Sequence, residues 1–487
     1  MEKFLSLSKR RGFIFQNSEI YGGINATWDY GPLGVELKRN INQVWWQSMV
    51  HQHPNVVGLD SAILMHPRVW EASGHLRNFT DPLVECNNCH QRFRADDLPS
   101  APNCPSCDGI LSDPRQFNLM FSTTMGPLDS LQEVLQVSNE VSRQLQTTIE
   151  SFDKESFDIE SISALLPLLD GKIREASSVL QRSRIYLRPE TAQGIFTNFA
   201  NIANTTRLKL PFGIAQIGKA FRNEITPGNF TFRTREFEQM ELEFFVKPGT
   251  DEDWFNYWVS NRLNWYVDLG INKDNLRLQE HSSDNLAHYA KKVIDIEYKF
   301  PWGWAELEGI ANRTDFDLRQ HSEFSGQELK YFDEETHEHY YPYIIEPSGG
   351  VDRAALAVLL DSYCEEIIQP TQPGGKTDNR TLLKLHSCLS PYKAAILPLS
   401  KNEQISPLSL EVYEMVRAKY SSTYDISQSI GRRYRRQDEI GTPYCITIDF
   451  DSLNDNQVTV RDRDTMKQIR IPINTLMETL DTKLKGN

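Results

Sequence analysis

Apolar residues recur at helical spacing in the stretch that begins at Pro32. Proline suits the first turn of a helix, where its missing N–H needs no partner. The positions that follow lie three or four residues apart, on one face of a helix: Leu33, Leu37, Ile41, Val44, Trp45 and Met49. This pattern predicts an amphipathic helix over residues 32–50. Trp45 and Trp46 are adjacent and cannot both face one core, so we expect this helix to pack against a second copy in a homodimer.

Strand patterns follow between residues 205 and 246. Apolar and polar positions alternate from Phe212 to Gln216, and residues 236–246 are apolar and acidic in a β-like way. The loop sequence Thr226-Pro227-Gly228-Asn229 lies between these two segments. The region is therefore predicted to form two strands joined by a loop.

A further strand and helix are expected nearer the C-terminus. Residues 341–346 read as a strand that runs through Pro347-Ser348-Gly349-Gly350 into a helix over 351–366. Residues 369–380 are rich in glycine, proline and polar residues, which is typical of a linker.

The rest of the chain divides into two parts. After residue 380, short apolar strands such as 394–399 and 444–450 alternate with helical stretches, which predicts a separate α/β domain. Residues 122–183 lack aromatic anchors and chemistry but have helical periodicity, so we interpret them as an inserted helical region.

Composition narrows the class of protein. Of 487 residues, 39% are hydrophobic and 24% are charged, as in folded globular proteins. The longest apolar stretch, residues 354–360, is far below the roughly 18 residues of a membrane span. The N-terminus also lacks a secretory signal, so no membrane partner is expected. The net charge of −14 argues against a broadly basic surface, although a local basic groove can lie on an acidic body.

Four of the seven cysteines form two Cys-x-x-Cys pairs, Cys86 with Cys89 and Cys104 with Cys107. Four thiolates at this spacing can complete a tetrahedral zinc shell without an open position for water, so we predict a structural zinc site. Four unrelated free thiols, or redox cysteines, are the alternatives. Free thiols beside paired ones suit a reducing compartment, and we expect a cytoplasmic protein.

Two segments carry residues suited to a nucleotide. The first, residues 221–237, includes Arg222 at a strand end, where it can bind a phosphate or carboxylate. It also includes Phe237, whose ring can stack on a purine. The second, residues 346–353, places two glycines before a helix N-terminus, where anions are favoured. Each segment alone also has an ordinary explanation, a cross-strand ion pair for the first and a tight turn for the second.

In this order the segments resemble the signature motifs of class II aminoacyl-tRNA synthetases. Motif 1 matches residues 32–50, motif 2 residues 221–237 and motif 3 residues 346–353. Further blocks resemble the glycyl-tRNA synthetase family of the dimeric single-chain type, at residues 187–196, 236–241, 309–317 and 431–441.

The resemblance implies an α+β fold, in which the antiparallel class II synthetase sheet of seven strands is flanked by helices. A zinc-binding insertion and a C-terminal α/β anticodon-binding domain complete it. The implied organisation is a catalytic domain at 1–80 and 184–368, a zinc-binding module at 81–121, a helical insertion at 122–183, a linker at 369–380 and an anticodon-binding domain at 381–487. The implied reaction is ATP-dependent attachment of glycine to tRNA(Gly) through a glycyl-adenylate, with ATP, Mg²⁺ and structural Zn²⁺ as cofactors.

The motif match also implies the nucleotide site. Arg222 would bind the α-phosphate and the glycine carboxylate, Glu224 the adenine amino group, and Arg353 the outer phosphates and the adenine ring. These three are the expected catalytic residues, and Glu306 is the expected carrier of Mg²⁺. The full set expected to bind ATP is Arg222, Asn223, Glu224, Phe232, Arg233, Thr234, Arg235, Glu236, Phe237, Glu306, Leu307, Gly350, Val351, Asp352 and Arg353.

Glycine has no side chain, so a site can recognise only its ammonium and carboxylate groups. The family places Glu190, Glu241, Glu346 and Ser348 around the ammonium, and three carboxylates clustered without a cation would be costly. The substrate-binding residues implied are Arg94, Glu190, Phe237, Glu238, Gln239, Met240, Glu241, Glu346, Pro347, Ser348, Gly349 and Gly350.

The C-terminal domain carries a cluster of arginines expected to contact tRNA, namely Arg432, Arg433, Arg435 and Arg436. The alternative is a solvated helix face whose arginines pair with acids such as Asp438 and Glu439. The family commonly has an aromatic residue where this chain has Glu308, and we expect altered packing near the nucleotide there.

Two other classes of protein compete with a synthetase. A non-catalytic, synthetase-like nucleic-acid-binding subunit would not need Arg222, Glu224, Arg353 and Glu190, all of which are present. An ATP-dependent ligase that charges a carrier protein would lack residues 381–487.

Overall fold

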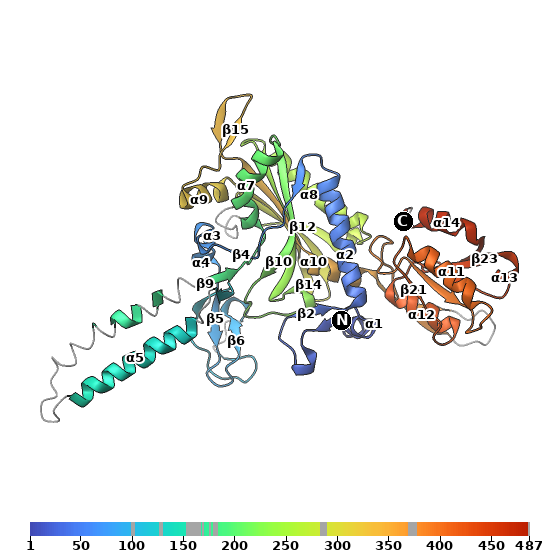
Figure 1. The fold of residues 1–487 in the computed structure, drawn as a ribbon, viewed down its shortest axis with the longest axis horizontal. Helices are drawn as coiled ribbons and strands as arrows, with labels where there is room; N and C mark the ends of the chain where they lie inside the picture. The colour runs from blue at the N-terminus through green and yellow to red at the C-terminus, as the bar shows by residue number, and fades with distance from the viewer. Residues whose placement is uncertain are drawn as a thin grey trace.

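A seven-stranded sheet forms the centre of the molecule (Figure 1). In this computed structural model the described residues are 1–98, 103–125, 130–151, 167, 170–174, 177–178, 184–282, 290–368 and 377–485. The strand order is β12 (Leu276–Glu280), β13 (Lys292–Phe300), β14 (Gly303–Thr314), β17 (Tyr343–Gly350), β11 (Glu236–Val246), β10 (Phe212–Phe221) and β3 (Val56–Gly58). All neighbours are antiparallel except β3, which runs parallel to β10.

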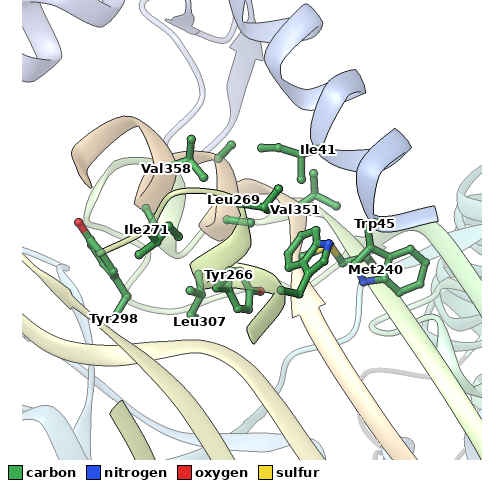
Figure 2. Packing of buried hydrophobic residues seen from close by; sticks show 14 of the residues in the cluster. Ile41, Trp45, Met240, Tyr266, Leu269, Ile271, Tyr298, Leu307, Val351 and Val358 are labelled. Atoms are coloured by element: carbon green, nitrogen blue, oxygen red, sulfur yellow. The ribbon is translucent and has the colours of Figure 1, made fainter. Parts of the chain in front are cut away.

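Three helices cover one face of this sheet: α2 (Pro32–Trp46), α8 (Asp251–Asp268) and α10 (Val351–Ser362). The predicted helix over 32–50 is present, and its last turn, Gln47–His51, has π-helical geometry. Figure 2 shows Trp45 of α2 beside Met240 of β11, in the same apolar cluster as Ile41 of α2 and Tyr266 of α8. The large apolar core between the sheet and these helices fixes the position of the strands.

The tryptophan argument for a homodimer is wrong. Trp45 is 1% exposed in the core, and Trp46 packs against the edge of the same core. A Cβ on Gly58 would lie 2.4 Å from the Trp46 ring, so the ring covers strand β3 of its own chain. Both rings therefore find partners within one chain: Trp45 packs in the core, and Trp46 covers β3, the edge strand of the sheet.

The opposite face of the sheet is covered by α7 (Ala192–Thr206) and α9 (Phe316–Ser325). Phe196 and Phe199 of α7 pack with Phe212 of β10 and Phe245 of β11 in a second, smaller apolar cluster. Consecutive residues of β11 thus face different cores, Phe244 the first and Phe245 the second. This alternation decides which side chains of β11 can reach a site.

The cysteine-rich segment forms a small sheet of β5 (Thr80–Glu85), β6 (Arg92–Arg94) and β7 (Arg115–Asn118). A second small sheet joins β4 (Leu64–Met65), β9 (Arg184–Leu187) and β8 (Ser122–Thr124). Residues 122–124, expected in the helical insertion, are therefore a strand. The long helix α5 (Ser130–Ser151) projects away from the body (Figure 1), and most of the remaining residues up to 183 lie outside the described ones.

The N-terminus forms α1 (Glu2–Arg11) and a hairpin of β1 (Ile14–Gln16) and β2 (Trp28–Tyr30). The short helices α3 (Pro67–Ala72) and α4 (His75–Asn78) precede the cysteine-rich sheet, and β15 (Tyr331–Asp333) pairs with β16 (Glu338–Tyr340). No helix among the described residues has both the length and the apolar character needed to cross a membrane.

The helix predicted over 351–366 ends at Ser362 and is followed by strand β18 (Tyr363–Ile368). This strand pairs with β19 (Asp378–Leu383), so residues 378–380 of the expected linker belong to a strand. Residues 369–376 of that linker lie outside the described ones. The buried side chain of Arg380, which donates to Asp438 and Glu366, holds β19 in place.

The C-terminal domain has a five-stranded sheet in the order β21 (Ser422–Tyr424), β20 (Ala394–Pro398), β22 (Tyr444–Ile448), β23 (Gln457–Asp462) and β24 (Gln468–Pro472). Strand β20 is parallel to both of its neighbours, as expected for an α/β domain. The helices are α11 (Ser406–Arg417), α12 (Ile430–Ile440), α13 (Ser452–Asp455) and α14 (Leu476–Lys485). Figure 1 shows this domain at the end of the molecule opposite to α5.

Candidate active site

A polar cavity opens at one end of the central sheet, on the face that α7 and α9 cover. Strand ends, the loop after β10 and the start of α10 contribute its walls. Its lining residues are Arg222, Glu224, Thr231, Phe232, Arg233, Thr234, Phe237, Gln239, Glu306, Ser348, Gly349, Gly350, Asp352 and Arg353. The structure therefore brings together most of the residues that the motif match assigned to ATP.

Three arginines and three acids supply the charged groups of this cavity. The Arg222 guanidinium lies between the rings of Phe79 and Phe237, 5.3 and 5.2 Å from their centroids, and donates to the Pro189 carbonyl. Arg353 lies over the Phe232 ring and pairs with Glu306 at 3.1 Å. Arg353 also lowers the pKa of Glu306. Aromatic rings thus lie against both guanidinium groups at the cavity wall.

The period of β11 separates the predicted substrate residues into two sets. Gln239 and Glu241 face the cavity side, where each is hydrogen-bonded to Ser348. Glu238 pairs with Lys38 of α2 at 2.8 Å, and Met240 is buried in the core under α2 and α10. The side chains of Glu238 and Met240 therefore point away from the cavity, because alternate residues of a strand face opposite sides.

Three predicted nucleotide residues also have structural roles. The side chains of Leu307 and Val351 are fully buried in the core, so only their backbone can reach a ligand. Asp352 accepts hydrogen bonds from Tyr30 at 2.7 Å, from Lys38 at 3.2 Å and from the Glu238 backbone N–H. It therefore joins α2, β2 and β11 at the base of the cavity.

An acidic pocket adjoins the arginine-rich cavity. Glu241 accepts hydrogen bonds from Ser348 at 2.8 Å and from Thr191, and Glu346 pairs with Arg313 at 2.8 Å. Glu190, at the start of α7, lies 3.3 Å from the His75 ring. The four residues that the resemblance placed around an ammonium group are thus held on β11, β17 and the segment before α7, with the carboxylates turned toward one another.

The pKa values in this pocket diverge. Burial and the neighbouring Glu190 raise the pKa of Glu241, and burial raises the pKa of Glu346 well above its usual range despite Arg313. Burial acts in the same direction on Glu190, but His75 and Arg313 outweigh it, so that pKa is lowered. Two ionised carboxylates within 4.8 Å of each other, as in this pocket, repel by at least about 3.5 kcal/mol at an effective dielectric of about 20. The arrangement therefore favours a bound cation.

Sequence reasoning missed several residues of this pocket. Arg313 pairs with both Asp317 and Glu346, and it lies in the 309–317 block that was quoted only for its resemblance. Glu243 was also missed, although it stands two residues after Glu241 and so shares its face of β11. Glu241, Glu243 and Glu346 each place one oxygen within 4.8 Å of the others.

The four cysteines of the two Cys-x-x-Cys pairs converge. The Cys86 and Cys107 sulfurs are 3.5 Å apart, and those of Cys89 and Cys104 are 3.7 Å apart. Tetrahedral zinc with Zn–S bonds of about 2.3 Å needs sulfurs about 3.8 Å apart. Backbone N–H donors lower the pKa of Cys86 to about 6, and a Cβ on Gly109 would lie 3.0 Å from its sulfur. These residues fit a zinc ion.

The remaining predicted residues lie away from this cavity wall. Arg94 pairs with Asp81 at 3.3 Å and with Asp96 at 3.6 Å, and it is not among the lining residues. Glu308 forms a buried pair with Arg262 of α8, so its packing concerns the face of the sheet opposite to the acidic pocket. Glu308 also packs beneath Gly349 of the cavity lining, where a Cβ on Gly349 would lie 3.1 Å from a Glu308 oxygen, so altered packing near the nucleotide stays a prediction.

The arginine cluster of α12 is not a uniform basic face. Arg433 is 2% exposed and donates to the backbone carbonyls of Pro398, Leu399 and Asp425, so the expectation that it contacts tRNA is wrong. Its guanidinium instead ties α12 to the loops after β20 and β21. Arg436 pairs with Asp425, and Arg435 lies 3.9 Å from Asp438, whereas Arg432 is exposed.

Comparison with known proteins defines the class first. Residues 178–363 match the tRNA synthetase class II core domain (G, H, P, S and T), and residues 393–483 match an anticodon binding domain. Prolyl-tRNA synthetase from Cryptosporidium parvum, solved with halofuginone and AMPPNP, shares the fold, with a TM-score of 0.59 and 14% identity over 99% of this chain and 75% of that chain. The chain is a class II aminoacyl-tRNA synthetase.

Curated relatives specify the family. The glycine–tRNA ligase of Thermobifida fusca is 48% identical over 100% of this chain and 98% of its own length. Those of Staphylococcus epidermidis and Macrococcus caseolyticus are 50% and 51% identical, each over 100% of this chain and 99% of the relative. The chain belongs to the glycine–tRNA ligase family, and the predictions of its fold class, family and enzymatic nature are confirmed.

Proposed function

We propose that the chain attaches glycine to tRNA(Gly) in two steps, through a glycyl-adenylate. The observation that carries this proposal is the junction of the nucleotide cavity with the acidic pocket: Ser348 lines the cavity, accepts a hydrogen bond from Gln239 and donates one to Glu241 of the acidic pocket. An amino acid placed across this junction has its ammonium among carboxylates and its carboxylate beside arginines. No protein nucleophile is required, because positioning and charge neutralisation supply most of the catalysis.

In the first step, the glycine carboxylate attacks the α-phosphorus of ATP and pyrophosphate leaves. Arg222, which lies between Phe79 and Phe237, would stabilise the charge that develops on the α-phosphate oxygens. Arg233 and Arg353 would bind the outer phosphates, and Glu224 would receive the adenine amino group. Glu306 is the carboxylate that would hold Mg²⁺, which neutralises phosphate charge when bound.

Recognition of glycine rests on the acidic pocket. Glu190, Glu241 and Glu346 would surround the ammonium, with Ser348 fixing the Glu241 carboxylate. In the second step, a terminal ribose hydroxyl of the tRNA attacks the activated carbonyl, and AMP leaves. The C-terminal domain would bind the anticodon arm, with Arg432 as the exposed cation of α12.

A homodimer remains part of this proposal on different grounds. Ile20 and Tyr21 are each 87% exposed and Ile24 is 55% exposed, next to the β1–β2 hairpin that packs on α2. An exposed apolar group of this kind on one loop is typical of a protein contact. Structural zinc in the cysteine module and a reducing compartment such as the cytoplasm, which suits seven cysteines without a disulfide, also belong to the proposal.

Glycine-dependent exchange of pyrophosphate into ATP tests the first step without tRNA. The Arg222→Ala variant should lose this exchange, since the guanidinium acts mainly on the transition state. The Arg432→Ala variant should retain it. Exchange that persists in Arg222→Ala, or that another amino acid supports as well as glycine does, would contradict the proposal. A nucleic-acid-binding subunit without catalysis would show no exchange in the unaltered protein.

A further inference from the structure

Glu243 is a buried carboxyl group without a visible partner. It is 0% exposed, and neither of its oxygens has a hydrogen-bond partner within the part of the chain that the structure describes. On β11 it lies between Glu241 of the acidic pocket and Phe245 of the aromatic cluster under α7. Its cross-strand neighbour on β10 is Ile214. An ionised carboxylate in this position would be desolvated without compensation, which is the most expensive state for such a group.

The charged groups around Glu243 add to this cost. Glu346 on β17 and Glu241 on the same strand each place an oxygen within 4.8 Å of a Glu243 oxygen. Arg313 on β14 is the nearest cation, but it is occupied by two bonds to Asp317 of α9 and one to Glu346. The titratable groups that face Glu243 are therefore three acids, Glu241, Glu346 and Asp317, and one base, Arg313. Burial, together with the charges of these acids, raises the pKa of Glu243 well above its usual range, although Arg313 acts in the opposite direction.

We propose that Glu243 is a neutral carboxylic acid that donates its proton in a hydrogen bond to Glu346 and thereby positions that carboxylate for the substrate ammonium. This inference rests on the proposed role of Glu346 in glycine binding. Glu243 is a positioning residue in this scheme, since the ammonium contacts Glu346 and not Glu243.

The hydrogen-bond pattern selects Glu346 over Glu241 as the acceptor. Both oxygens of Glu241 already accept bonds, one from Thr191 and the other from Ser348. On Glu346, Arg313 donates to Oε1, while Oε2 accepts no hydrogen bond from the described residues. The proposed bond would join Glu243 to this Oε2, and the two side chains each place an oxygen within 4.8 Å of the other. The pKa values of Glu243 and Glu346 are both raised, so the pair holds one proton, and it resides on Glu243 because Glu346 alone is paired with Arg313 at 2.8 Å. The proton also removes one negative charge from a pocket that must hold three carboxylates around one ammonium.

Three variants separate this role from the alternatives, by their KM values for glycine and for ATP in pyrophosphate exchange. Glu243→Gln keeps a neutral donor of the same length, so the KM for glycine should stay within about threefold of the unaltered enzyme. Glu243→Leu lacks the donor and should raise it roughly tenfold, the effect of one hydrogen bond to a charged group. Neither variant should change the KM for ATP. Glu346→Gln, which removes the carboxylate itself, should raise the KM for glycine by about tenfold or more.

The outcomes distinguish the two proposals. If Glu346→Gln leaves the KM for glycine unchanged, the proposed ammonium site is wrong. If Glu346→Gln raises it and Glu243→Gln raises it equally, Glu243 is ionised and binds the ammonium directly, which overturns the inference. If Glu243→Leu binds glycine normally, Glu243 only fills space, which also overturns it.

A spectroscopic signature tests the protonation state without glycine. The unaltered protein at neutral pH should show the infrared carbonyl band of a protonated carboxyl group, although an exposed carboxyl is ionised there. The component due to Glu243 should disappear in Glu243→Gln and persist in Glu328→Gln, a change at an exposed pair with Lys330. An unchanged band in Glu243→Gln would overturn the inference.

Discussion

The buried ion pair of Glu308 and Arg262 should stabilise the fold and leave nucleotide binding unaffected. Arg262 of α8 donates to the two oxygens of Glu308 at 2.6 and 3.2 Å, and the two side chains are 0% and 1% exposed. In Glu308→Gln the Arg262 charge stays buried without its counter-ion. Breaking a buried pair in this way costs about 3–5 kcal/mol, of which the Trp265 ring, 4.4 Å from the guanidinium, offsets only part.

Thermal unfolding measures this effect. In a large domain, each kcal/mol of lost stability lowers the Tm by about 2–4 °C, so the Tm of Glu308→Gln should fall by roughly 6–20 °C. Replacing both partners with leucine should recover much of the loss, because no buried charge remains. As a control, Glu365→Gln breaks an exposed pair with Lys3, with side chains 44% and 76% exposed, and should cost less than about 1 kcal/mol.

Pyrophosphate exchange completes this test, because Glu308 points toward α8 and away from the acidic pocket. Below its lowered Tm, Glu308→Gln should keep the KM for ATP of the unaltered enzyme. A variant with a normal Tm but a raised KM for ATP would refute the reasoning and place Glu308 in the nucleotide site after all.

The remaining predictions concern the zinc site, tRNA and the oligomeric state. Cys104→Ser should release about one equivalent of zinc and destabilise the cysteine module, because three ligands hold zinc poorly; metal analysis that finds no zinc in the active unaltered protein contradicts this. Arg432→Glu should weaken tRNA binding and lessen its salt dependence without changing glycine-dependent exchange, and tRNA titration at two salt concentrations measures both effects. Tyr21→Asp should shift a dimer toward monomers in sedimentation equilibrium, whereas a monomeric unaltered protein would exclude the dimer.

The strands that carry the site were predictable from local pattern. Residues 236–246 coincide with β11, and the alternation from Phe212 to Gln216 falls within β10. Such segments are determined by period-two alternation and by a loop signal between them, and both are local properties of the sequence. The acidic pocket could be anticipated only through the resemblance, because Glu190, Glu241 and Glu346 are far apart in the sequence.

Contacts between distant segments explain why the sequence misplaced the end of the helix at 351–366 and the role of Arg433. Residues 363–366 continue a helical pattern, yet they pair with β19, whose Arg380 is anchored by Asp438 of the C-terminal domain. Arg433 lies in a run of arginines that reads as a basic surface, but it is buried where backbone carbonyls of two loops converge. A long charged side chain can satisfy the backbone as well as a ligand, and the sequence alone does not distinguish these uses.

Strand β11 shows why burial, and not sequence, identifies its function. Its acids at 241 and 243 alternate with apolar Leu242 and Phe244, as on a surface strand with one solvated face. Helices α7 and α9 cover that face, however, and Glu241 and Glu243 are 1% and 0% exposed. The charge of Glu241 costs free energy in the unliganded protein, and a ligand of opposite charge offsets that cost, whereas Glu243 avoids it as a neutral acid. A small cation such as the glycine ammonium meets this condition, and a larger amino acid would gain no more from the same charges.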